Sequence, residues 1–480
     1  MSERMHFSFK LGKQGDWNRP RKPDKGFTVV MLGAFGGGTG TGNPLLEGVT
    51  RLHPVDIDTL DDVIARLQPS LTIAQGGEGG SLSLRFTGMD DFHPDGLLAQ
   101  LGDYRLAPGE TATDEPPQAA REREAAAESG HEDEAESEQA TLSRLLGERP
   151  LSAERQRDTG SSSSGPRQAM IEDVVRRIAE TATVFNEPVA IEGGPAEGEQ
   201  PDTRAASLRG LLHHEPFQKL EASWRSVDWL LHATEPDPAI RFYILNMTRG
   251  ELQRLQSDHA EAKSSPLHHL LRERIGGEDA SESDFILIDN HHYGPDQANI
   301  AMLEWLGSLV DHYDGTLLAG ADPGFMTDSA PADDRHEEWQ KFRTSPVAAR
   351  IALLYPDVLL RLPYGASTDP VQTFSFEELI EPWTMDQLLW GNPAYARLIL
   401  LLNQWTSQGE REQPALLTDL PAYSYQSEGE RHLQPCAKHL LHEQQIELLL
   451  ELGLVPVIGS RSRNAIQIPW YQHLALPAGA

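Results

Sequence analysis

Phe285-Ile286-Leu287-Ile288-Asp289 is an apolar run that ends on an acid, and it opens the part of the chain that decides the fold. The run predicts a strand. A helical pattern follows over Ala301–Tyr313, and Gly315–Ala321 predicts another strand. Strands that alternate with helices are typical of sheets with crossover connections, so this stretch predicts an α/β fold.

The same alternation continues outward from this stretch. Arg241–Asn246 predicts a strand, and Leu211–Leu231 predicts a helix with one apolar stripe. Nearer the N-terminus, Phe27–Leu32 predicts a buried strand, Asp58–Leu67 an N-capped helix with acids in its first turn, and Ser81–Phe86 a half-buried strand. We therefore expect an α/β fold class: a mixed sheet with flanking helices, in two blocks joined by a disordered acidic linker.

Composition excludes several functions. The chain has 480 residues, with 41 Lys+Arg and 73 Asp+Glu, which gives a formal net charge of −32. This balance argues against binding to nucleic acid or to anionic lipid. Cys436 is the single cysteine, so no intramolecular disulfide or Cys-rich metal site is expected. The sequence shows neither a secretory signal nor a membrane-spanning run, and this predicts a cytoplasmic protein. No cofactor is expected.

Charge and Ser/Gly content divide the chain into three parts. Residues 108–140 hold eleven acids and two bases and no aliphatic side chain larger than Ala, which predicts disorder. Residues 158–167 are rich in Ser and predict a flexible linker. The expected domains are residues 1–106, a linker over 107–168, and residues 169–480.

A short amphipathic helix is expected near residues 141–147, within the linker. Leu142, Leu145 and Leu146 share one helical face. A helix this short is marginal alone in water. Its leucines therefore predict either a partner groove, a return onto the chain's own domain, or no role.

Two motifs suggest other chemistry and carry less weight. Gly36–Gly42 (GGGTGTG) follows a strand and has the letters of a tubulin-like phosphate loop, but its context favours a surface loop. The pairs His213-His214, His268-His269 and His291-His292 suggest a metal, yet adjacent helical residues point about 100° apart and rarely chelate one ion. Asp289-Asn290 and the acids around Asp311 are explained by capping as readily as by catalysis. No enzyme is expected.

Several strings together resemble the large subunit (TssC/VipB) of the type VI secretion contractile sheath. They occur in family order across residues 140 to 470: Leu212–Arg225, Phe342–Ser345, Val358–Gly365, Phe374–Glu378 and Leu389–Ala396. The first block resembles the small sheath subunit (TssB/VipA) at Phe27–Gly33, Pro54–Asp58, Leu84–Phe86 and Met89–Asp95. The chain thus looks like a fusion of both subunits, each shortened.

The resemblance implies a structural role in contraction-driven effector delivery. Implied partners are type VI sheath subunits, further copies of this chain, inner-tube or baseplate proteins, and the AAA+ ATPase that dismantles contracted sheath. Leu142, Leu145 and Leu146 match the helix that this ATPase grasps. The implied interface or core motif residues are Trp224, Arg225, Arg361, Pro363, Tyr364, Gly365, Trp390, Asn392 and Tyr395.

These motif residues also have a direct physical interpretation. The aromatic residues suit core or interface anchoring, the two arginines suit fork-shaped pairs with carboxylates, and the Pro/Gly/Asn residues suit turns. Both family-like segments lack later strands of the family pattern, so two alternatives stay open. One is a capping or adaptor protein that mates with a sheath and cannot polymerise. The other is a nucleotide-binding protein that uses Gly36–Gly42.

Overall fold

The computed structural model describes a discontinuous set of residues. They are residues 26–37, 51–74, 81–101, 203–275, 283–326, 333–406, 415–427 and 430–476. All of them belong to one compact unit, which is formed by Met1–Pro108 together with Met170–Ala480. The second unit, Gly109–Ala169, lies outside the described residues, as do the predicted acidic linker and its leucine helix.

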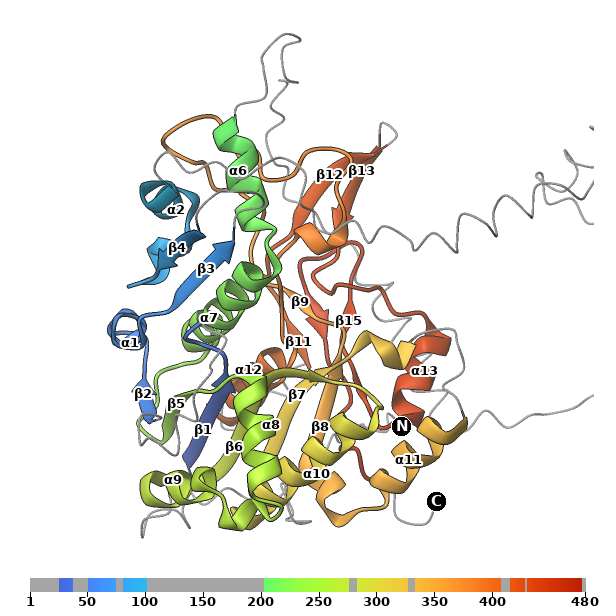
Figure 1. Cartoon of the computed structure of the whole chain (residues 1–480). Helices are drawn as coiled ribbons and strands as arrows, with labels where there is room; N and C mark the ends of the chain where they lie inside the picture. Colours follow the sequence, from blue (N-terminus) through green and yellow to red (C-terminus); the bar gives the residue numbers. More distant parts are fainter. Residues whose placement is uncertain are drawn as a thin grey trace, which may run out of the picture. The chain divides into compact units, whose positions relative to one another are not determined.

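A seven-stranded mixed sheet forms the centre of the compact unit (Figure 1). Its strands, in spatial order, are β14 (Val455–Pro456), β8 (Ile351–Tyr355), β7 (Thr316–Ala321), β6 (Ser283–Tyr293), β1 (Gly26–Gly33), β5 (Ile240–Asn246) and β2 (Leu52–Val55). Neighbours run parallel except β2, which pairs antiparallel with β5. The predicted α/β class with a mixed sheet is confirmed.

Strand β1, which was predicted at Phe27–Leu32, is an interior strand of this sheet. Seven residues of β1 pair with β5 on one side, and seven pair with β6 on the other. Its side chains alternate between the two faces: Val29 and Met31 belong to one hydrophobic core, and Val30 and Leu32 to the other. Both faces are covered, which explains why the sequence of this strand is continuously apolar.

Helices cover each face of the sheet. One face packs against α1 (Leu60–Leu67), α7 (Glu215–Ala233) and α12 (Ala394–Thr406). The other face packs against α8 (Arg249–Asp258), α9 (Pro266–Ile275), α10 (Gln297–His312), α11 (Asp333–Arg343) and α13 (Glu443–Glu451). The unit is therefore a three-layer sandwich, with the sheet between two helical layers.

Smaller elements complete the described part. A separate hairpin joins β3 (Ser70–Ala74) and β4 (Ser81–Arg85), and it is followed by the 3₁₀ turn η1 (Met89–Phe92) and by α2 (Pro94–Leu101). The remaining strands are β9 (Val358–Leu359) with β10 (Trp390–Gly391), β11 (Leu416–Leu417) with β16 (Ile466–Gln467) and β15 (Ile458–Gly459), and β12 (Tyr423–Ser427) with β13 (Glu430–Gln434).

Two element boundaries differ from the sequence prediction. The helix expected over Leu211–Leu231 is two helices, α6 (Thr203–Leu212) and α7, because the chain is extended at His214, the residue before α7. Pro216 follows in the first turn of α7, where a missing N–H costs nothing. Strand β6 runs four residues past Asp289, with a register shift between Asp289 and His292.

The glycine run after β1 has a packing role where it is described. Gly36 N–H donates to Asn246 Oδ1 at 2.9 Å, and Gly36 O accepts from Ser70 N–H. Gly37 has φ of +72°, and a Cβ there would lie 2.5 Å from Ser70 O. These two glycines thus allow the turn after β1 to lie close to the end of β5 and the start of β3, while residues 38–42 lie outside the described residues.

Candidate functional site: a buried ion cluster on α7

Helix α7 presents an acid and a base one turn apart to the interior. Glu221 is fully buried, and Arg225 Nε donates to its Oε1 at 2.7 Å. The spacing of four residues places both side chains on one helical face. Trp224, the residue before Arg225, is also fully buried, and its indole Nε1 donates to Phe35 O at 3.0 Å.

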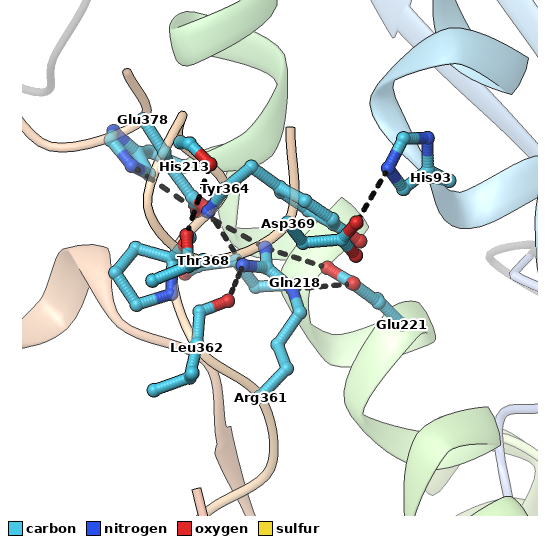
Figure 2. Close-up of polar contacts among 12 residues, drawn as sticks. His93, His213, Gln218, Glu221, Arg361, Leu362, Tyr364, Thr368, Asp369 and Glu378 are labelled. Atoms are coloured by element: carbon cyan, nitrogen blue, oxygen red, sulfur yellow. Dashed lines mark hydrogen bonds and ion pairs between the residues drawn. The ribbon is translucent and has the colours of Figure 1, made fainter. Parts of the chain in front are cut away.

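Arg361 bridges this helix to the segment that follows β9. Its Nε donates to Glu221 Oε1 at 2.8 Å, and its Nη1 donates to Glu378 Oε2 at 2.7 Å (Figure 2). Its Nη2 reaches the second oxygen of each carboxylate, at 3.3 and 3.1 Å. Arg361 is therefore held by two forks, and with Arg225 the cluster balances two bases against two acids.

Each buried charge is stabilised by its neighbours. Burial alone would lower the pKa of Arg361, but the carboxylates of Glu221 and Glu378 outweigh it and raise that pKa well above its ordinary value. Burial alone would raise the pKa of Glu378, but Arg361 lowers it to about 2. Both groups are therefore charged at neutral pH, and each depends on the other.

The turn Pro363–Gly365 closes the cluster. Tyr364 N–H donates to Glu378 Oε2 at 2.7 Å, and the Tyr364 hydroxyl accepts from Arg225 Nη2 at 2.7 Å. The Arg361 guanidinium lies 4.2 Å from the centre of the Tyr364 ring. A Cβ at Gly365 would overlap the Glu377 carboxylate, so that exposed side chain would have to move.

The segment after this turn also contacts the first block. The Asp95 carboxylate accepts hydrogen bonds from Gln372 N–H and from Thr373 Oγ1, the latter at 2.8 Å. His93 Nε2 lies 3.5 Å from Asp369 Oδ1, as Figure 2 shows. Residues 93–95 thus contact residues 369–373, which lie on the same segment as Arg361.

A second polar cluster lies at the carboxyl end of β6. Asn392 Nδ2 donates to Asp289 O, and Asn392 Oδ1 accepts from Ala394 N–H at the start of α12. The hydroxyl of the fully buried Tyr395 donates to Asn290 Oδ1 at 2.7 Å. These contacts fix α12 against the sheet.

The predicted motif residues thus divide between two places. The first cluster contains Arg225, Arg361, Pro363, Tyr364 and Gly365, beside Trp224. The second contains Asn392 and Tyr395, while Trp390 lies apart, half-buried, with its Nε1 donating to Met385 O at 2.7 Å. Leu142, Leu145 and Leu146 lie outside the described residues.

The histidine pairs do not converge on one point. His291 Nδ1 contacts Asp289 at 2.6 Å, whereas His292 Nε2 contacts Asp357 at 2.7 Å. Within the described ranges, no group of three or more His, Cys, Asp or Glu side chains is arranged to hold a metal ion. None of the described helices is long and apolar enough to cross a membrane.

Sequence reasoning assigned no role to the acids of these contacts. Glu221, Glu378 and Asp95 all occur inside the family-like strings, but nothing marked them among 73 acidic residues. The one local signal was the spacing of Glu221 and Arg225 on the apolar side of a predicted helix. An acid on a face that also carries Trp224 must be paired when it is buried.

The described part of the chain is thus a three-layer α/β domain in which buried charges join a helix to a loop. Residues 203–468 match the VipB family, described as EvpB/VC_A0108, tail sheath N-terminal domain. The match covers more than half of the chain, so the chain belongs to this family of tail-sheath proteins. It is also similar to the type VI secretion system sheath protein TssC1 of Pseudomonas aeruginosa, with 25% identity over 336 residues, 64% of this chain and 67% of that protein. The resemblance to the large sheath subunit is confirmed.

Proposed function

We propose that this chain is a structural component of a type VI secretion sheath that carries a small-subunit-like segment and a VipB domain in one polypeptide. The observation that carries the fusion is the position of β1. This strand lies outside the family match at residues 203–468, yet it occupies the space between two strands within the match, β5 and β6.

The geometry makes β1 necessary to the sheet. Adjacent strands lie about 4.8 Å apart, so β5 and β6 are separated by about twice that distance and cannot bond each other across β1. Seven register pairs on each side would lose their partners if β1 were absent. The VipB domain therefore needs a strand from outside its own span, and fusion supplies it in a fixed one-to-one ratio.

The proposal is tested by cutting the full-length protein. A site for a specific protease is inserted near residue 155, in the unit 109–169, and the purified protein is cleaved. The two pieces should elute together from a size-exclusion column and separate only in denaturant. Separation under native conditions would show that β1 does not bind the VipB domain as the structure implies.

The wider role follows from the family. We propose that the chain acts in the cytoplasm by assembly and not by catalysis, with sheath subunits, with inner-tube or baseplate proteins, and in contraction-driven delivery. We also propose that Leu142, Leu145 and Leu146 form the handle for the AAA+ ATPase that dismantles contracted sheath. Replacing Leu145 and Leu146 by Asp should abolish pull-down by that ATPase, and unchanged pull-down would reject the handle.

One observation favours the capping or adaptor alternative. The strands at both edges of the seven-stranded sheet are short: β14 has two residues, and β2 has four with Pro54 among them. Short edges with proline resist addition of further strands. Negative-stain microscopy of the purified protein separates the alternatives, since tubes support a polymerising sheath protomer and discrete particles support a cap.

A further inference from the structure

We propose that a face formed by the β12–β13 hairpin and the segment 380–385 binds an extended, basic segment of a partner protein. This hairpin face consists of Ile380, Trp383, Met385, Tyr423 and Tyr425. It contains no residue of the ion cluster or of β1, and it does not depend on the proposed fusion.

The hairpin face exposes large apolar side chains that the rest of the described surface mostly lacks. Ile380 is 53% exposed and Met385 39% exposed, and both lie within three residues of Trp383. In the described ranges, only two other large apolar side chains are comparably exposed, Ile57 and Leu448, and they lie on other elements. Ile380 and Met385 thus add exposed apolar area on either side of Trp383.

Aromatic rings form the centre of the face. Trp383 meets Tyr423 and Tyr425 edge to face, with ring centres 5.8 and 5.0 Å apart. The two tyrosines are stacked on one another, and Tyr425 is stacked on His432 of the neighbouring strand. Trp and Tyr held in place by such contacts lose little entropy on binding and are frequent anchors of interfaces.

The backbone of the hairpin offers a place for another strand. Strands β12 and β13 pair through five residues, and neither belongs to a larger sheet in the described part of the chain. A two-stranded hairpin gains stability from a third strand or from packing on one face. The sequence of β12, Tyr423–Ser427, holds no charged residue to block such an addition.

The acidic side chains around the hairpin face indicate a basic partner. Glu377 and Glu381 are exposed beside the face, and Asp386, 82% exposed, lies next to Met385 and pairs with Lys438 Nζ at 2.9 Å. Burial first, and then the carboxylates of Glu377, Glu381 and Glu378, raise the pKa of Tyr423. An aromatic surface with an acidic rim favours Lys or Arg side chains. A second copy of a chain with a net charge of −32 is a poor match for this rim.

The test uses the full-length protein and a labelled peptide of about nine residues that alternates lysine and valine. Fluorescence anisotropy should show saturable binding that weakens as salt is raised. Trp383→Ala and Tyr425→Ala should each weaken binding by about tenfold or more, as expected for aromatic anchors. Gln426→Pro should weaken binding to a similar extent, because it removes a backbone donor from a strand at the sheet edge.

The controls separate the face from general effects. Leu448→Ala removes a similarly exposed apolar side chain elsewhere and should leave binding unchanged, and circular dichroism checks that each variant is folded. A peptide with glutamate in place of lysine should not bind. Equal binding of both peptides, or undiminished binding by folded Trp383→Ala, would overturn the proposal. Concentration-dependent dimerisation that Trp383→Ala abolishes, without peptide binding, would assign the face to a second copy instead.

Discussion

The centre of the sheet around β1 and the ion cluster around Arg361 both join segments that are distant in sequence, but by different means. Every residue of β1 is buried, and its contacts are mostly apolar side chains and backbone pairing, with the Thr28 hydroxyl hydrogen-bonded to Ser283 and Arg241. In the ion cluster Glu221, Arg361 and Glu378 are buried and Arg225 is half-buried, and the contacts are made by charged side chains.

The two regions therefore contribute differently to the fold. Apolar burial stabilises without regard to the exact partner, at about 25 cal/mol per Å². Buried ions gain little overall because desolvation offsets their attraction, but the loss of one partner is costly. We interpret the sheet centre as the main source of stability and the ion cluster as the device that fixes the position of residues 361–378 on α7.

The largest expected effect is in the sheet centre. Val30→Pro removes a backbone donor and forces the proline ring into a strand with neighbours on both sides, which should cost at least about 3 kcal/mol and prevent folding. Val30→Ala, which keeps the backbone, should cost about 2 kcal/mol and remain folded. Urea denaturation followed by circular dichroism measures both. A folded, stable Val30→Pro variant would show that β1 is not paired on both sides.

The next effect tests the ion cluster. Arg361→Met leaves Glu221 with Arg225, and Glu378 with only the Tyr364 N–H and with His213 at 3.7 Å. It should lower the free energy of unfolding by about 3 kcal/mol. Adding Glu378→Gln restores the balance of one acid and one base, so the double variant should be more stable than Arg361→Met alone. If the double variant is the less stable of the two, the cluster does not act as a charge-balanced unit.

The two regions were unequally predictable from the sequence. Strand β1 was recognisable because six consecutive residues, Phe27–Leu32, contain five large apolar side chains, and its bounds of Gly26–Gly33 agree with the prediction. Its place between β5 and β6 was not predictable, because hydrophobic pattern gives burial but not strand order. The carboxylate partners of Arg361 are 140 and 17 residues away, and no local pattern encodes such pairing.

Acid should open the ion cluster before it affects the sheet centre. The pKa of Glu378 is lowered from 4.5 to about 2 in the folded protein, so its contribution is complete above pH 4.5 and is lost as the pH falls toward 2. This shift corresponds to about 3 kcal/mol of stability. Urea denaturation at several pH values should show the decline, and Glu378→Gln should flatten it. An unchanged pH profile in that variant would place the acid sensitivity elsewhere.

The smallest expected effect concerns the outer contact between residues 93–95 and the segment after Gly365. Asp95→Ala removes the acceptor for Gln372 N–H and Thr373 Oγ1 in a partly exposed place, and it should cost about 1 kcal/mol. Asp90→Ala, an exposed acid in the same segment, is the matched control and should cost less. Hydrogen exchange at the Gln372 amide should accelerate in Asp95→Ala alone, while amides of β1 keep their protection. If the amides of β1 also lose protection, then the pairing of β1 and the contact of residues 93–95 are energetically coupled. In that case the sheet centre would not be an independent source of stability.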